Sequence, residues 1–120
     1  MRVLAIDPAL RNTGFAVLEC GGPSGNEFRT LTYGVIENKK KLLPSACLVA
    51  IRDNLNQVIQ AHSPDVCAIE SVIYVQSYRT AITLGAARGA AIIAAAEHGL
   101  SVHEYPPKRV KQAVVGKGGA

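Results

Sequence analysis

Short apolar runs occupy the first third of the chain, and turn-forming residues separate them. The runs cover residues 2–7, 14–20 and 28–37, and the stretch 21–26 between the last two reads Gly-Gly-Pro-Ser-Gly-Asn. Runs of this length predict strands, and such a dense cluster of turn formers cannot continue a strand. Because the links are short, we expect the three strands to form an antiparallel meander.

Helical and strand patterns alternate through the rest of the chain. Apolar residues recur at helical spacing after Pro44, and this helix should end near His62 because Pro64 disfavours helical geometry just before it. The elements expected next are a strand at 66–70, a loop at 71–77, a helix at 78–98, a strand at 101–105 and a short basic helix from Pro106 to near Gly116. A strand–helix–strand crossover usually makes its two strands parallel. The order predicts one α/β domain over residues 1–120: a mixed five-stranded sheet with strands 1-2-3 antiparallel and strands 1, 4 and 5 parallel, flanked by helices.

Two of the predicted strands end on a carboxylate. The run Val-Leu-Ala-Ile stops at Asp7, and the run Val-Cys-Ala-Ile stops at Glu70. Continuous apolar runs suit strands that are buried on both faces. If these strands are parallel neighbours, about 4.8 Å apart, the two carboxylates meet at one edge and can share a cation. The simpler alternatives are that Asp7 caps a turn and that Glu70 is a surface carboxylate.

Composition narrows the class of protein. The chain has 120 residues, 48% of them hydrophobic, which fits one domain with a packed core. It contains no apolar run long enough to span a membrane and no signal-peptide pattern, so we expect a cytoplasmic protein. The three cysteines form no CxxC pair, so the pattern indicates neither a zinc site nor a disulfide framework.

The net charge of +4 comes entirely from the end of the chain. No acid follows Glu104, and the basic residues beyond it are Lys108, Arg109, Lys111 and Lys117. A basic segment without acids fits contact with phosphates, although a solvated terminus has the same composition. A second basic run, Lys39–Lys41, is predicted to be a solvated loop.

Five segments, in order, carry a resemblance to a known family. They are Ile6-Asp7-Pro8, Asn12-Thr13-Gly14, Ala68-Ile69-Glu70, Leu84-Gly85-x-Ala87-Arg88-Gly89 and Lys111-Gln112-x-Val114-Val115-Gly116. Together they resemble the RuvC-type Holliday junction resolvases of the ribonuclease H-like superfamily. The resemblance implies a homodimeric, Mg²⁺-dependent endonuclease that cuts four-way DNA junctions by symmetric nicks in two strands of like polarity.

The same resemblance implies roles for individual residues. Asp7 and Glu70 match the first two acidic metal ligands, and Lys111 matches a basic catalytic residue near the scissile phosphate. The complete enzyme would hold two Mg²⁺ ions, with Mn²⁺ as a substitute, and would work beside branch-migration proteins. The expected DNA contacts are Thr13, Tyr74, Arg88, Lys108, Arg109, Lys111 and Lys117. Simpler interpretations make Thr13 a turn residue and give Arg88 an ion pair. The small-residue helix 78–98 is the candidate dimer contact, or it packs on its own sheet.

The sequence also departs from the family pattern. Ala9 stands where the family usually has glycine. In the loop after Glu70, the aromatic residue is Tyr74, one place later than the family's position, which is Ile73 here. Two further acidic ligands belong to a helix beyond the last matched segment, which the 120 residues do not include, so we expect weak Mg²⁺ binding and poor cutting. The rival hypotheses are a noncatalytic DNA-binding module, half of an actin-like ATPase or sugar kinase, and a nuclease of ribosomal RNA maturation.

Overall fold

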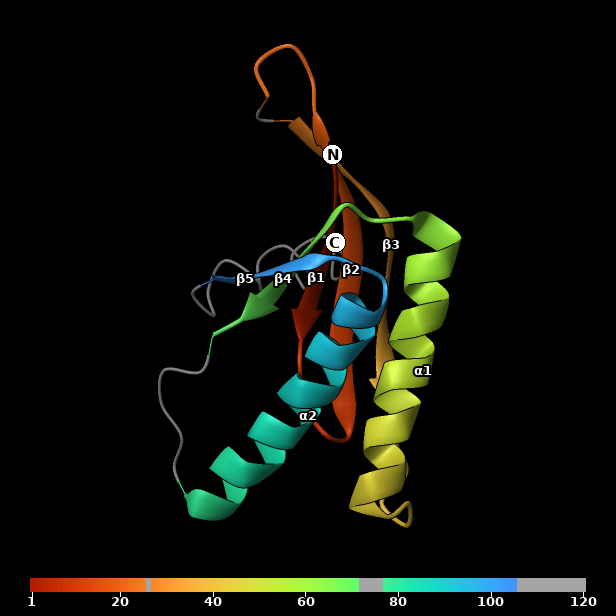
Figure 1. The fold of residues 1–120 in the computed structure, drawn as a ribbon, viewed down its shortest axis with the longest axis vertical. Helices are drawn as coiled ribbons and strands as arrows, with labels where there is room; N and C mark the ends of the chain where they lie inside the picture. The colour runs from red at the N-terminus through yellow and green to blue at the C-terminus, as the bar shows by residue number, and fades with distance from the viewer. Residues whose placement is uncertain (26, 72–76, 106–120) are drawn as a thin grey trace.

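A five-stranded sheet with two helices on one face forms the fold (Figure 1). The computed structural model describes residues 1–25, 27–71 and 77–105. The elements are β1 (Arg2–Asp7), β2 (Asn12–Gly21), β3 (Glu27–Glu37), α1 (Pro44–His62), β4 (Val66–Glu70), α2 (Tyr78–Glu97) and β5 (Ser101–Tyr105). The short basic helix predicted after Pro106 lies outside the described residues.

The strand order is β3-β2-β1-β4-β5. β2 pairs antiparallel with both β1 and β3, whereas β4 runs parallel to β1 and to β5. The predicted meander and the predicted parallel set are both confirmed. β2 begins at Asn12, two residues earlier than expected, because Asn12 and Thr13 extend the ladder by pairing with Glu37 and Ile36 of β3.

The main core lies between the sheet and the helices. Side chains of one face of the central strands, such as Leu4 and Ile69, are fully buried against Ile51 and Leu55 of α1. α2 packs through an alanine stripe, and its buried residues are Ala87, Ala90, Ala91, Ala94 and Ala95. Because alanine carries only a methyl group, this stripe lets the helix backbone come close to its neighbours. The predicted packing of this helix on its own sheet is therefore confirmed.

Local signals fix the ends of α1, and an ion pair joins it to α2. Pro44 stands in the first turn, where its missing N–H costs nothing, and Ser63 ends the helix in the left-handed conformation with φ 46°. Arg52 of α1 donates to both carboxylate oxygens of Glu97 of α2, at 2.7 Å each. This hydrogen-bonded guanidinium lowers the pKa of Glu97 below its usual value.

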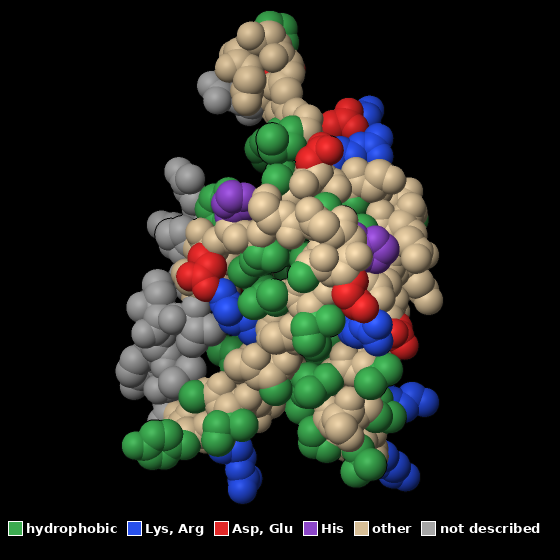
Figure 2. Space-filling model, viewed as in Figure 1, with side chains coloured by type: hydrophobic (Ala, Val, Ile, Leu, Met, Phe, Trp, Pro, Cys, Tyr) green, Lys and Arg blue, Asp and Glu red, His purple; other side chains and the backbone are tan. Residues whose placement is uncertain are grey.

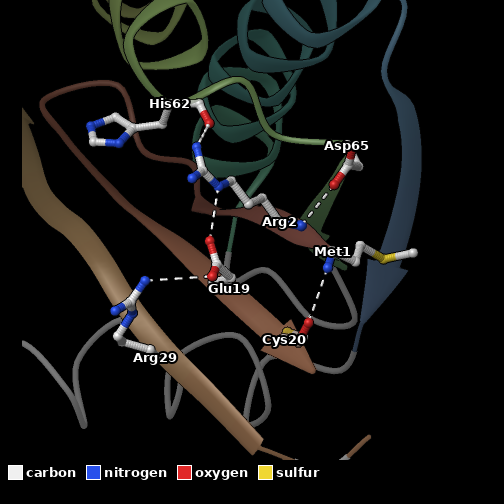
Figure 3. Close-up of polar contacts among 7 residues, drawn as sticks. All are labelled: Met1, Arg2, Glu19, Cys20, Arg29, His62 and Asp65. Atoms are coloured by element: carbon white, nitrogen blue, oxygen red, sulfur yellow. Dashed lines mark hydrogen bonds and ion pairs between the residues drawn. The ribbon is translucent and has the colours of Figure 1, made fainter. Parts of the chain in front are cut away.

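A cluster of polar contacts joins the start of β1 to the neighbouring elements (Figure 3). The Arg2 side chain donates to Glu19 Oε2 of β2 at 3.1 Å and to the His62 carbonyl at the end of α1 at 2.7 Å. The Arg2 backbone N–H donates to Asp65 Oδ2 at 2.8 Å, and Arg29 of β3 forms a second ion pair with Glu19. These contacts tie β1 to β2, to α1 and to the segment before β4, so they help to fix the register of β1 between its neighbours.

Candidate active site

The two predicted carboxylates lie on neighbouring parallel strands. Ile6 of β1 is in register with Ile69 of β4, and the next residues are Asp7 and Glu70, the last of each strand. Strands of a sheet are about 4.8 Å apart, so the two side chains lie within reach of one cation. The predicted convergence of the two strand ends is confirmed by this register.

Alternation along the strands decides which way these side chains point. Ile6 and Ile69 belong to the core beneath the helices. Successive side chains of a strand point to opposite faces, so Asp7 and Glu70 project toward the face that α1 and α2 do not cover. Both residues are partly buried. The arrangement therefore offers carboxylate oxygens at the carboxyl edge of the central strands, where open α/β sheets bind ligands.

A buried hydroxyl holds the turn that follows Asp7. Thr13 is fully buried, and its hydroxyl donates to the Ala9 carbonyl at 2.6 Å while accepting from the Ala9 N–H at 3.3 Å. With no exposed surface, this hydroxyl has no access to a phosphate in the structure. Thr13, which pairs with Ile36 at the start of β2, is accordingly reassigned from DNA contact to a residue whose hydroxyl holds the turn, close to the simpler of the two interpretations that its sequence allowed.

Arg11 and Asn38 fix the same turn from the other side, and the sequence predicted a role for neither. Asn38 Nδ2 donates to the Leu10 carbonyl at 2.8 Å, and the Asn38 N–H donates to the Arg11 carbonyl at 2.8 Å. The Arg11 guanidinium donates in turn to the carbonyls of Lys39 and Leu42. No motif signals these roles, because the acceptors are backbone carbonyls about thirty positions away in the sequence.

Arg88 has an acidic partner within the chain. It forms an ion pair with Glu104 of β5, and only 22% of its side chain is exposed. This contact corresponds to the ion-pair interpretation, so a role of Arg88 in DNA binding would require it to leave Glu104. The remaining predicted contacts lie outside the described residues: Tyr74, Lys108, Arg109, Lys111 and Lys117.

The described residues contain no group of three or more His, Cys, Asp or Glu side chains that could hold a metal ion. The donor set that they offer at this edge is the Asp7 and Glu70 pair. Cys67, three residues before Glu70, faces the core, and burial raises the pKa of its thiol to about 12. It is therefore a neutral core residue rather than a thiolate ligand.

In the part of the chain that the structure describes, none of the helices combines the length and apolar character needed to cross a bilayer.

Known proteins resemble this chain over its whole length. The family model described as crossover junction endodeoxyribonuclease RuvC matches residues 3–120. A protein of that name from Akkermansia muciniphila is 51% identical over 120 residues, which are all of this chain and 70% of that protein. Its namesake from Caldicellulosiruptor saccharolyticus is 40% identical, with 71% of that protein covered. The solved structure of T. thermophilus RuvC in complex with a Holliday junction substrate superposes with a TM-score of 0.83 at 28% identity, covering 97% of this chain and 69% of the other.

Proposed function

Since this chain belongs to the RuvC family of crossover junction endodeoxyribonucleases, we propose that it resolves Holliday junctions by metal-assisted hydrolysis at Asp7 and Glu70. The observation that carries the proposal is the parallel pairing of β1 with β4, which brings both acids to one edge of the sheet. The sheet order, with its three-stranded meander and two parallel strands, supports the same assignment. A kinase or ATPase half would need a second, similar domain.

The donor chemistry of this edge fits Mg²⁺. This ion is commonly held by one or two carboxylates together with water and substrate phosphate, and Asp7 and Glu70 supply two carboxylates. A bound divalent ion would activate a water molecule and stabilise the charge that develops on the phosphate. Asp7 on the central strand β1 and Glu70 on the neighbouring strand β4 would both hold this ion.

Hydrogen bonds hold the turn that follows Asp7. Thr13, Asn38 and Arg11 fix the turn behind Asp7. The Asp7 carboxylate is therefore already in position before the substrate binds. Lys111 is proposed, on the resemblance alone, as the cation near the scissile phosphate. Together the acids would bind the metal, and the lysine would offset the negative charge of the phosphate.

A homodimer is the second part of the proposal, with α2 as its contact. Exposed apolar side chains lie along this helix, and Tyr78 is 91%, Ile82 73% and Ile93 52% exposed. A Cβ atom added at Gly85 or Gly89 would meet nothing within 4 Å, so packing inside the chain does not require these glycines. Figure 2 shows hydrophobic side chains gathered at the lower left, over the start of α2. A second copy packed here would set two active sites at a fixed spacing, which symmetric nicking requires.

Junction cleavage tests the chemical proposal. The protein is incubated with a synthetic four-way junction and Mg²⁺, and the products are resolved on a denaturing gel. D7N and E70Q should each slow nicking at least a hundredfold, while junction binding measured in EDTA persists. Asp53, an exposed acid on α1, provides the matched control D53N, which should cut like the unchanged protein. Equal cutting by D7N would refute the assignment, and binding without any cutting by the unchanged protein would favour a noncatalytic module.

Sedimentation tests the dimer. The unchanged protein should sediment as a dimer, and I82E, which places a charge on the exposed face of α2, should sediment as a monomer. V49E, at a 54% exposed apolar position on α1, is the control and should remain dimeric. An I82E variant that remains dimeric, or a V49E variant that dissociates, would contradict the choice of α2.

A further inference from the structure

A loop of three consecutive lysines connects β3 to α1. Lys39, Lys40 and Lys41 are all exposed, and none of them has an ion pair among the residues that the structure describes. Their sequence alone predicts no more than a solvated loop. Three adjacent like charges repel one another, so a segment that holds them together without an acidic partner is suited to a polyanion.

The loop has a defined shape. Asn38 is buried, and its Nδ2 donates to the carbonyls of Leu10 and Cys47 at 2.8 and 3.3 Å. Arg11 Nη1 donates to the Lys39 and Leu42 carbonyls at 2.7 and 2.8 Å, and the Leu42 N–H closes a turn onto the Lys39 carbonyl. A backbone held in this way loses little entropy when its side chains bind a partner.

The electrostatic surroundings of the loop are mainly positive, and the one acid that lines the same hollow as Lys39 and Lys41 is Glu37 at the end of β3, which forms no ion pair with them. The Arg11 guanidinium donates to two carbonyls and to the Cys47 sulfur, and among the described residues no acid forms an ion pair with it. α1 begins directly after the loop, with no acidic residue in its first turn and no side-chain cap at Leu43. The positive end of the helix dipole therefore adds to the charge of the lysines.

The loop lies beyond the edge of the sheet that carries the two acids. Asp7 pairs with Gly14, which pairs with Val35 of β3, and the lysines follow four to six residues further along the chain. In Figure 1 β3 runs down to this loop at the foot of α1, and Figure 2 shows Lys and Arg side chains projecting at the lower right. Two strand spacings and five residues of chain put Lys40 roughly 15–20 Å from Asp7.

We propose that Lys39, Lys40 and Lys41 bind the phosphate backbone of the DNA arm beside the cut. This inference rests on the proposed function, because the scissile phosphate sets the position of the arm. DNA advances about 3.4 Å per base pair along each strand, so the contacted phosphates lie about five base pairs from the cut. Lysine recognises phosphate as a point charge, so the contact strengthens binding without reading sequence.

Salt-dependent binding tests the inference. The affinity of the chain for a four-way junction and for a linear duplex is measured in EDTA between about 50 and 200 mM salt. Removing two phosphate-binding charges in K39Q/K41Q should reduce the slope of log K against log salt by about 2, for both DNAs. The affinity difference from the unchanged chain should therefore be about tenfold larger at the lower salt concentration than at the higher one. The control Q57E/Q60E changes net charge equally at the far half of α1 and should keep the slope.

Phosphate ethylation interference locates the phosphates that the lysines contact. The unchanged chain should show interference at phosphates about five base pairs from the cut, and in K39Q/K41Q these signals should disappear while those at the cut remain. An unchanged slope, an equal effect of the control, or interference confined to the cut would overturn the lysine contact and leave the proposed function intact. Failure of the unchanged chain to bind any DNA would overturn both.

Discussion

Replacing Thr13 with valine removes one hydroxyl from beneath the turn that follows Asp7 while keeping the shape of the side chain. The hydroxyl has two partners, the carbonyl and the N–H of Ala9, and Thr13 itself is fully buried. Valine can make neither contact, so both backbone groups of Ala9 lose their partner. A buried polar group left without a partner costs about 1–3 kcal/mol. Because the Ala9 side of these contacts is only partly buried, we expect T13V to lower the free energy of unfolding by about 2–3 kcal/mol.

Thermal unfolding measures this destabilisation. The entropy of unfolding is about 2.1 cal/mol/K per residue, or roughly 250 cal/mol/K for a chain of 120 residues. One kcal/mol then corresponds to about 4 °C, so T13V should melt about 8–12 °C below the unchanged protein. If the turn also positions Asp7, junction cutting by T13V should slow even at temperatures where the variant is fully folded.

Serine at the same position separates the effect of the Thr13 hydroxyl on stability from the effect of its buried methyl group. T13S keeps the oxygen and removes one buried methyl group, which should cost about 1 kcal/mol, or about 4 °C. The expected order of melting temperature is therefore Thr, Ser, Val from highest to lowest. If T13S melted below T13V, packing of the methyl group would outweigh the hydrogen bonds, and the assignment of Thr13 as a hydrogen-bonded turn residue would be wrong.

Packing and ion pairs elsewhere in the chain lead to three further predictions. Burial raises the pKa of the Cys67 thiol to about 12, so between about pH 9 and 12 the thiol ionises in the unfolded chain but stays neutral in the folded one. The contribution of the thiol to stability is therefore lost as pH rises through that range. In chemical denaturation across the same range, C67A should lose less stability than the unchanged protein. The pKa of Glu97 is lowered by Arg52, so the contribution of this pair is present above pH 4.5 and lost on acidification; E97Q should flatten the acid limb of the stability curve slightly, and an unaltered limb would show that the pair contributes nothing. A Cβ at Gly34 would lie 2.9 Å from Phe15 Cζ, so G34A should displace that ring and cost about 1 kcal/mol, measured by urea denaturation; a more stable G34A would contradict this.

The order of elements was predictable because each strand and helix has its own periodicity. The placement of Asp7 and Glu70 at one edge of the sheet followed from two apolar runs and the rule that a crossover makes strands parallel. The early start of β2 was not predictable, because Asn12 and Thr13 look like turn residues and join the ladder only through partners on β3. The role of Arg11 was hidden for a similar reason, since its acceptors are backbone atoms that no sequence pattern marks.

α2 shows a different limit of sequence reasoning. Its many small residues indicated close approach by some neighbour, and the spacing of glycine and alanine could not say which face met the sheet. The structure buries Ala87, Ala91 and Ala94 in the core and leaves Gly85 and Ala86 exposed. Helical periodicity is almost uninformative when nearly every position is small, because the two faces hardly differ in hydrophobicity.

Parallel pairing of β1 with β4 also determines when the two acids, Asp7 and Glu70, can come together during synthesis. Asp7 is made early in translation, but its neighbouring acid follows the whole meander and α1, and the two meet only when β4 docks against β1. Closing so long a loop is slow compared with forming a hairpin or a helix. A nascent chain that has released only the meander and α1 therefore carries one half of the acid pair, and the pair proposed to bind the metal forms only when the sheet is assembled.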